Sequence, residues 1–334
     1  MQQKPLKGVN LGGWLVLEKW ITPSLFADTT AVDEYTFCKQ ASKRELTRLQ
    51  HFRDSFITKQ DFVWLAAQGI QAVRLPIGYW VFGDAAPYQP TSDYVNSAFA
   101  WANETGIKIL LDLHGVPGSQ NGKDHSGQKG TVAWSQNTDD VSRTLRVVRR
   151  LAERYGRNQA LLGISLLNEP ARLLPKATLR TYYETAYDIL REHCRKDAWI
   201  VFSDGFAPRR WRTELSRKTH THTYIDTHHY QVFSPLDKRL SVRLNLLRTH
   251  WQLPRKLARM NRHHPVVVGE WSLTLGGSNL AKYSGDKRRA LLKEYARLQL
   301  KAYQRSAAWF FWTYRTEHGG SWSFRDCVMQ GLLD

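Results

Sequence analysis

Short apolar segments alternate with longer amphipathic segments along the chain, and this alternation limits the fold more than any other feature. The apolar segments are rich in Val, Ile and Leu without regular polar alternation, which is typical of parallel strands buried on both faces. We expect such strands at 7–12, 69–76, 106–114, 162–169, 198–203, 224–230, 266–270 and 308–313. Helical stretches are expected near 58–68, 93–104, 138–155, 176–195, 241–262 and 286–306.

Alternation of strand and helix through eight strands predicts an α/β fold, a single (β/α)8 TIM barrel. An open doubly wound sheet is the alternative, but it would not bring the first, fourth and seventh strands around one cleft. The 334 residues contain no linker and no repeat, and they suffice for one such barrel with its loops. We therefore expect one domain over residues 1–334.

Two of the expected strands end in a glutamate. The segment LGISLLNEP closes with Asn168, Glu169 and Pro170, and because proline cannot donate to a strand ladder we expect this strand to end at Glu169. The segment PVVVGEW presents Glu270 in the same way. A glutamate at this place could simply cap the next helix. Two carboxylates at the carboxyl ends of barrel strands, however, are the arrangement that glycoside hydrolysis requires.

Polar and aromatic side chains also follow the other expected strands. They are Asn10, Glu18, Arg74, His114, His228, Tyr230 and Trp312. Each has an ordinary explanation, such as a structural ion pair for Arg74 or core packing for Trp312. Together they also suit glycosidic cleavage, since Arg74 would keep Glu270 ionised and Tyr230 could donate a hydrogen bond to the same carboxylate. Asn168 would hold a sugar 2-hydroxyl, and Trp312 would form a flat apolar floor for a sugar ring.

Longer motifs carry a resemblance to a known family. In chain order they are GVNLGGWLVLEKWITPSLF, LPIGYW, LDLHGVPGSQNG, NEP, THHYQVF, VVVGEWS and FWTYRTE, from about Gly8 to about Ser323. Together they resemble glycoside hydrolase family 5, and within it the exo-β-1,3-glucanase (glucan β-1,3-glucosidase) branch. The resemblance implies a retaining (β/α)8 enzyme in which Glu169 is the acid/base and Glu270 the nucleophile. It also implies carboxyl groups about 5–5.5 Å apart.

The resemblance extends to further positions and fails at one. The family's remaining active-site positions are matched by Arg74, His114, Asn168, His228, Tyr230 and Trp312. Glu18 matches a carboxylate that holds hydroxyls of the terminal glucose. After LDLHGVPGSQNG the exo-glucanases have an aromatic residue that clamps the next sugar together with the phenylalanine of HYQVF. Here Lys123 takes that place while Phe233 is kept, so another β-linkage, a non-glucan aglycone, an anionic acceptor and transglycosylation stay open.

The chain is strongly basic, with a net charge of +18. Arginines recur every three or four residues along one expected helix, which stacks them on one face. They are Arg143, Arg146, Arg150, Arg154 and Arg157. Such a row is typical of a solvated face, and it could also dock on an anionic polysaccharide or on lipid headgroups. Without a nucleic-acid-binding motif or an apolar run of about 18 residues, we expect no nucleic-acid partner and no membrane span.

Competing functions have weaker support. His220 and His222 could share a strand face and chelate zinc, but no cysteine or acidic partner completes the site, so we expect no metal and no cofactor. A serine hydrolase would need a GxSxG motif, which the sequence lacks. The non-enzyme alternative is a carbohydrate-binding or basic docking module on a barrel without chemistry. The three cysteines are too widely spaced for a disulfide framework.

The sequence thus predicts a retaining β-glycosidase that hydrolyses a β-glucan or β-glucoside. In its simplest form this is an exo-β-1,3-glucosidase that releases glucose by double displacement. The same chemistry on another β-linkage, or in transglycosylation, is the alternative. The first residues contain no apolar segment, so no signal peptide is expected in the sequence as printed, and the cellular location stays open.

Overall fold

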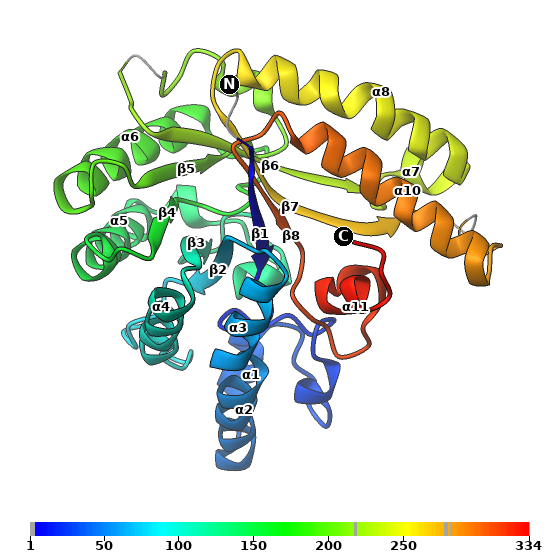
Figure 1. Ribbon diagram of the computed structural model, residues 1–334. Coiled ribbons are helices and arrows are strands. Elements are labelled where there is room, and N and C mark those ends of the chain that lie inside the picture. Colours follow the sequence, from blue (N-terminus) through cyan, green and yellow to red (C-terminus); the bar gives the residue numbers. More distant parts are fainter. Residues whose placement is uncertain (1–3, 217–218, 277–279, 281, 334) are drawn as a thin grey trace.

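Eight parallel strands close into a barrel in chain order, each hydrogen-bonded to the next and β8 to β1 (Figure 1). The computed structural model describes residues 4–216, 219–276, 280 and 282–333. The strands are β1 Leu6–Asn10, β2 Ala72–Gly78, β3 Lys108–Gly115, β4 Leu161–Ser165, β5 Trp199–Ser203, β6 Thr223–Gln231, β7 Val266–Leu275 and β8 Ala308–Phe311. All eight predicted strands are therefore confirmed, and the fold is the predicted (β/α)8 barrel.

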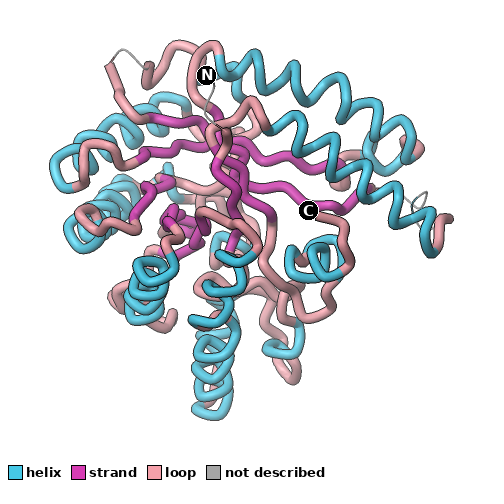
Figure 2. The backbone as a smooth tube through the Cα atoms, viewed as in Figure 1, coloured by secondary structure: helices cyan, strands magenta, loops and turns pink. Residues whose placement is uncertain are grey.

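Helices surround the barrel and separate most of its strands, as the tube in Figure 2 also shows. They are α1 Glu34–Gln40, α2 Lys43–Phe56, α3 Lys59–Ala67, α4 Ser92–Thr105, α5 Thr138–Tyr155, α6 Lys176–His193, α7 Pro235–Arg239, α8 Val242–Asn261, α10 Gly285–Tyr303 and α11 Phe324–Met329. Short 3-10 helices lie in the loops, η1 Pro23–Phe26, η2 Asp124–Ser126, η3 Trp134–Gln136, η4 Pro208–Trp211 and η5 Gly320–Trp322. Within the described residues, every helix is too short or too polar to cross a membrane.

The predicted helical stretches correspond to α3, α4, α5, α6, α8 and α10, whereas α1, α2, α7 and α11 are missing from the prediction. The start of α2 has a signal in the sequence. The Ser42 side chain accepts a hydrogen bond from the Glu45 amide, and the Glu45 side chain accepts one from the Ser42 amide. This reciprocal pair is a capping box, and its Ser-x-x-Glu spacing marks the first turn of a helix.

The two glutamate-bearing strands differ from each other in length. β4 ends at Ser165, so the expectation that this strand continues to Glu169 is wrong. The amide of Asn168 bonds to the carbonyl of Leu113 in β3, so the chain no longer runs in register with β5. Glu169 has a φ of 43°, a left-handed conformation that turns the chain out of the strand direction. Glu270, in contrast, lies inside β7.

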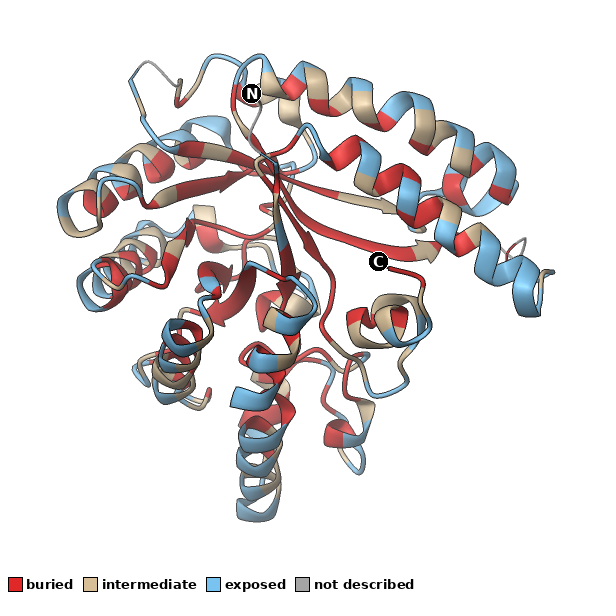
Figure 3. Cartoon of the chain, viewed as in Figure 1, coloured by how far each residue is buried: buried red, intermediate tan, exposed pale blue. Residues whose placement is uncertain are grey.

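The floor of the barrel is apolar, and the polar site lies above it. Strand side chains alternate between the lumen and the surrounding helices, and the strands are almost entirely buried (Figure 3). A cluster of buried side chains fills the lower lumen, Ala72, Leu110, Val201, Val267, Ala308 and Phe310. Two residues further along β2 and β3, Arg74 and Asp112 form an ion pair at 2.9 Å. The lumen therefore changes from apolar to charged within one layer of side chains.

A buried ion pair anchors the loop that follows β1 and carries Glu18. Arg53 in α2 bonds to one carboxylate oxygen of Glu34 at 2.7 Å, and the other oxygen accepts the amide of Leu17 at 2.8 Å. Both charged side chains are buried. The helices α1 and α2 thus hold this loop at the mouth of the barrel.

Gly8 makes room for the ring of Phe310 in the barrel floor, because a Cβ at Gly8 would lie 2.3 Å from that ring. We expect Gly8→Ala to lower the free energy of unfolding by about 1–3 kcal/mol through overpacking. Phe310→Leu in the same chain should recover part of that loss. Urea unfolding of the two single variants and the double variant measures this. A double variant that costs the sum of the two single changes would show that the two positions do not compete for space.

Candidate active site

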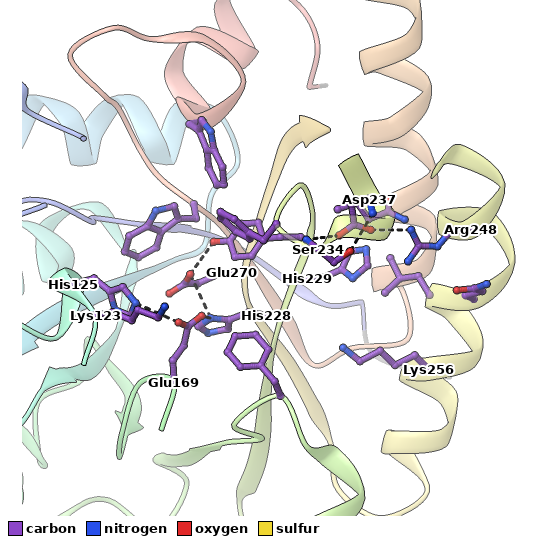
Figure 4. Close-up of a pocket in the computed structure, with 18 of the residues that line it drawn as sticks. Lys123, His125, Glu169, His228, His229, Ser234, Asp237, Arg248, Lys256 and Glu270 are labelled. Carbon is purple, nitrogen blue, oxygen red and sulfur yellow. Dashed lines mark hydrogen bonds and ion pairs between the residues drawn. The ribbon is translucent and has the colours of Figure 1, made fainter. Parts of the chain in front are cut away.

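A cavity of 1290 Å³ opens at the carboxyl ends of the barrel strands (Figure 4). Most of the side chains singled out from the sequence line it, namely Glu18, His114, Glu169, His228, Tyr230, Phe233, Glu270 and Trp312. Arg74 and Asn168 are buried behind this lining and bond to it, Arg74 to Glu270 and Asn168 to His114. The structure thus brings residues from separate strands and their loops into one site.

Glu169 and Glu270 meet at His228. One carboxylate oxygen of each glutamate and one ring nitrogen of His228 all lie within 4.8 Å of one another. His228 Nδ1 is 2.6 Å from Glu169 Oε1 and 3.3 Å from Glu270 Oε2, and Figure 4 shows the three side chains converging. The imidazole therefore contacts both carboxylates and can pass a proton between them.

Arg74 lies deeper in the barrel than these three side chains and bonds directly to Glu270. Its side chain is fully buried, and its two terminal nitrogens donate to Asn10 Oδ1 at 3.0 Å, to Glu270 Oε1 at 3.1 Å and to Asn168 Oδ1 at 2.8 Å. The same guanidinium pairs with Asp112 at 2.9 Å. One planar cation therefore positions polar groups from β1, β3 and β7 and from the loop after β4.

Two aspartates orient the histidines, and the sequence-based reading missed both. Asp112 precedes His114 by two residues and Asp226 precedes His228 by two, so each pair shares one strand face. His114 Nδ1 lies 2.6 Å from Asp112, and His228 Nε2 lies 3.3 Å from Asp226. The sequence signal that could have identified these two aspartates is the Asp-x-His spacing within a buried strand.

The two histidines differ in charge. Burial lowers the pKa of His114 to about 4, so its ring is neutral, with the proton assigned to the nitrogen that bonds to Asp112. Its other nitrogen then accepts from the Asn168 amide at 3.3 Å. Burial also opposes charge on His228, but the negative charges of Glu270 and Asp226 outweigh it and raise the pKa well above its usual value. His228 is therefore an imidazolium beside two carboxylates.

The two carboxyl groups titrate differently in this substrate-free arrangement. Burial alone would raise the pKa of Glu169, but the hydrogen bond and charge of His228 outweigh it and lower that pKa to about 2. Burial raises the pKa of Glu270 to about 7, although His228 and Arg74 oppose this, and the nearby charge of Glu169 adds to the rise. The cluster thus holds an exchangeable proton near neutral pH, as paired carboxyls do.

Aromatic rings form one wall of the cavity. Trp322 is 5.4 Å from Trp20 and 5.4 Å from Tyr230, measured between ring centroids, and Tyr230 is 5.4 Å from Phe233. Trp312 stacks on the ring of His114 at 5.6 Å with an interplanar angle of 7°. The sequence-based reading missed Trp20 and Trp322, because a tryptophan outside a strand end carries no signal that separates a sugar-binding ring from a core one.

The departure from the family pattern lies at the cavity mouth. Lys123 is exposed and lines the cavity, together with Phe206 and Phe233. His125, two residues after Lys123, approaches Glu169 Oε2 with its Nε2 at 3.4 Å. The segment that elsewhere supplies an aromatic ring therefore supplies a cation and a second histidine beside Glu169.

Among the described residues, one group of side chains is arranged so that it could bind a metal ion, namely Glu169, His228 and Glu270. Hydrogen bonds and ion pairs among these three already engage their ligand atoms. His220 and His222, the pair considered from the sequence, belong to no such group in the part of the chain that the structure describes. His220 Nδ1 instead lies 2.8 Å from the hydroxyl of Thr219.

The fold and the site define a class of protein. Two carboxyl groups with a buried arginine and an aromatic wall, at the carboxyl end of a (β/α)8 barrel, are typical of a glycoside hydrolase. Residues 35–318 match the cellulase family, glycosyl hydrolase family 5, and this chain belongs to that family. It is therefore a glycoside hydrolase.

Curated relatives agree with this assignment, and a solved structure has the same fold. The chain is 35% identical to probable glucan 1,3-beta-glucosidase A of Aspergillus niger over 98% of this chain and 87% of the relative. It is 34% identical to a glucan 1,3-beta-glucosidase of Blumeria graminis over 98% and 86% of the two chains. The crystal structure of rutinosidase from Aspergillus niger superposes with a TM-score of 0.81 at 22% identity, covering 100% of this chain and 99% of that one, which shows the shared fold.

We expect Arg74→Met to lower the free energy of unfolding by about 3–5 kcal/mol at pH 7, because it leaves buried carboxylates without their counter-charge. Burial opposes ionisation of Asp112, but Arg74 and His114 outweigh it and lower its pKa. This stabilisation is present above the pKa of an unfolded aspartate, about 3.9, and is lost only as the pH falls through the lower folded value. In the variant the unpaired carboxyl groups become protonated as the pH falls from 7. The difference in the free energy of unfolding between the native chain and the variant should therefore become smaller.

Urea unfolding at pH 7 and pH 5 measures that difference. Arg146→Met on the exposed face of α5 is the matched control, and it should cost little at either pH. An equal cost of Arg74→Met at both pH values would contradict the electrostatic account of this arginine.

Proposed function

We propose that this enzyme removes glucose from the non-reducing end of β-1,3-linked glucan with retention of configuration. The observation that carries the mechanism is the short distance between the two carboxyl groups, whose nearest oxygens lie within 4.8 Å. Retaining glycosidases have carboxyl groups about 5–5.5 Å apart, whereas inverting enzymes leave about 6.5–9.5 Å for a water molecule. The names of the relatives, glucan 1,3-beta-glucosidase, support the substrate.

In this proposal Glu270 is the nucleophile. Arg74 donates to one of its oxygens at 3.1 Å and the hydroxyl of Tyr230 donates to the other at 2.7 Å. Two donors on separate oxygens fix the orientation of the carboxylate and oppose the rise in pKa that burial causes, so that Glu270 is ionised above a pKa of about 7. Glu270 attacks the anomeric carbon, and a covalent glycosyl-enzyme forms as the bond to the leaving group breaks.

Glu169 is the acid/base, and it must carry a proton when the leaving oxygen departs. In the substrate-free arrangement it is ionised against His228, which holds a proton 2.6 Å away at Nδ1. We propose that this proton moves to Glu169 once a sugar ring lies over Glu270 and the carboxylate engages the anomeric carbon. The neutral His228 then takes the proton back when Glu169 accepts one from the attacking water.

The terminal sugar has a set of matching partners. Glu18 is buried, and its Oε2 accepts from Trp20 Nε1 at 2.8 Å. Its Oε1 has no hydrogen-bond partner among the described residues, which leaves an acceptor for sugar hydroxyls. The Oδ1 of Asn168 is held by Arg74, so its amide group can donate to the 2-hydroxyl of the sugar. The flat face of Trp312 supplies the apolar floor.

Two finer expectations stay predictions. Lys123 in place of an aromatic ring favours, as a second candidate, the same chemistry on another β-linkage or in transglycosylation, since a lysine cannot stack on a sugar. The arginine row of α5 remains a proposed docking face for an anionic polysaccharide. Against it, Arg143 and Arg150 bond to the backbone and the carboxylate of Asp84, respectively, which is the behaviour of a structural face.

Product analysis tests the substrate. On laminaritriose and longer β-1,3-linked oligosaccharides we expect glucose as the first product, with slower release from β-1,4- and β-1,6-linked oligomers. Glu270→Ala is the matched control and should give no product while its thermal unfolding stays cooperative. Longer transfer products, or hydrolysis of another linkage alone, would contradict the β-1,3 assignment while leaving the retaining chemistry intact.

A further inference from the structure

Part of the cavity lining comes from β6 and α8, which contact each other through Lys256 and Thr227, and we call this part the side lobe. Its lining includes His229, Ser234, Gln252, Arg255, Lys256 and Arg259. In Figure 4 the labelled members, His229, Ser234 and Lys256, lie on one side of Glu270 and His228, whereas Lys123 and His125 lie on the other. The proposed glucosidase chemistry uses none of these lobe residues.

Helix α8 gives the side lobe a basic face. Gln252, Arg255, Lys256 and Arg259 are spaced by three, one and three residues, so they fall on one side of the helix. Arg255 and Arg259 are exposed, and no ion pair joins Arg255, Lys256 or Arg259 to a carboxylate within the described part of the chain. A solvated basic face usually faces bulk water alone, whereas this one also lines the cavity that holds the two glutamates.

Asp237 is the acidic side chain among the described residues that line the side lobe, and its charge is already paired. Asp237 bonds to Arg248 at 2.8 Å and accepts the backbone amide of Ser234 at 3.2 Å. Lys256 donates to the hydroxyl of Thr227 at 3.0 Å, and its charge opposes the rise in pKa that burial causes at the nearby carboxyl of Asp204. The lobe therefore carries an excess of positive charge.

The charge of Lys256 affects the protonation of His229, its neighbour in the side lobe. Burial lowers the pKa of His229 to about 3, and the charge of Lys256 acts in the same direction. His229 is therefore neutral, and its Nε2 is buried without a hydrogen-bond partner among the described residues. An anion entering the lobe would meet the charges of Arg255 and Arg259, while the lining carboxylate of Asp237 is already paired with Arg248.

The side lobe lies on the leaving-group side of the cavity. Glu169, which in our proposal protonates the leaving oxygen, follows β4, and the lobe follows β6. Phe206, in the loop after β5, is 56% exposed and lines the cavity between these two places in the strand order. Phe233, which follows β6, is 64% exposed and lines the cavity at the same strand end as the lobe. Glu18 and Trp312, which serve the terminal sugar, come from β1 and β8. A leaving group that extends from Glu169 past the two rings would reach the basic face.

We propose that the side lobe binds an anionic group, a phosphate or a carboxylate, carried by the leaving group of the substrate. This inference rests on the proposed glycosidase function and narrows its substrate to β-glucosides with a negatively charged aglycone. Arg255 and Arg259 supply forked donors for such a group, and Lys256 supplies a point charge behind them. No chemical step beyond glycoside hydrolysis is involved.

Matched substrates test the proposal. Laminaribiose and laminaritriose are compared with forms that carry a phosphate on O6 of the reducing-end sugar, and with forms that end in glucuronate there. We expect kcat/KM about tenfold higher for at least one charged form, mainly through KM, and a preference that weakens as salt is added. A higher kcat/KM for the phosphorylated substrates alone would assign the site to phosphate, and a higher kcat/KM for both charged forms would show that it accepts either anionic group.

Variants locate the effect. Arg255→Gln with Arg259→Gln should abolish the preference for the charged form, whereas Arg243→Gln, exposed on the same helix outside the cavity lining, should keep it. Equal kcat/KM for charged and uncharged substrates would overturn the anion site and leave the glucosidase proposal standing.

A chain that hydrolyses none of these substrates would overturn the proposed function instead, and binding would then decide on the lobe. Calorimetry with the full chain carrying Glu169→Gln compares charged and uncharged laminaritriose. Tighter binding of the charged form, lost with Arg255→Gln and Arg259→Gln, supports the site. Equal affinities overturn it.

Discussion

The guanidinium of Arg74 is the contact on which the arrangement of the site depends. It is fully buried, and it donates to Asn10, Asn168 and Glu270 while pairing with Asp112. These partners come from different strands or their loops, so a single rigid side chain sets their positions relative to one another. A lysine in the same place would offer one charge without the planar fork that reaches several acceptors at once.

Beneath this arginine an apolar floor closes the barrel, and this floor affects the charged groups that lie above it. Charges above such a floor are poorly solvated, so each is satisfied by a neighbour or shifts its pKa. His114 loses its proton while His228 keeps one, although both are buried and both lie near an aspartate. The difference follows from the neighbouring charges, since Glu270 and Asp226 raise the pKa of His228 whereas Arg74 and His125 add to the lowering of the pKa of His114. In the proposed mechanism that histidine stores the proton that Glu169 needs.

Much of the fold could be predicted from the sequence, because the strands are continuous apolar runs separated by amphipathic helices. The end of β4 could not, since the turn at Glu169 depends on a hydrogen bond from Asn168 to another strand. Candidate site residues at strand ends could be predicted from position and residue type. Asp112 and Asp226 were not predicted, although each precedes a candidate histidine by two residues and so lies on the same strand face. The side lobe was beyond reach, since it forms where α8 packs near β6, a relation between distant segments that no local pattern records.

The central claim is that Glu270, held by Arg74, is the nucleophile of a retaining β-glucosidase. Incubation with 2-deoxy-2-fluoro-β-glucosyl fluoride, followed by mass spectrometry of the digested protein, tests it most directly. The fluorine slows breakdown of the covalent intermediate, so the attacking carboxylate stays labelled. We predict one added fluoroglucosyl group per chain, on the peptide that contains Glu270. A label on Glu169, or inactivation without any covalent label, would contradict the account.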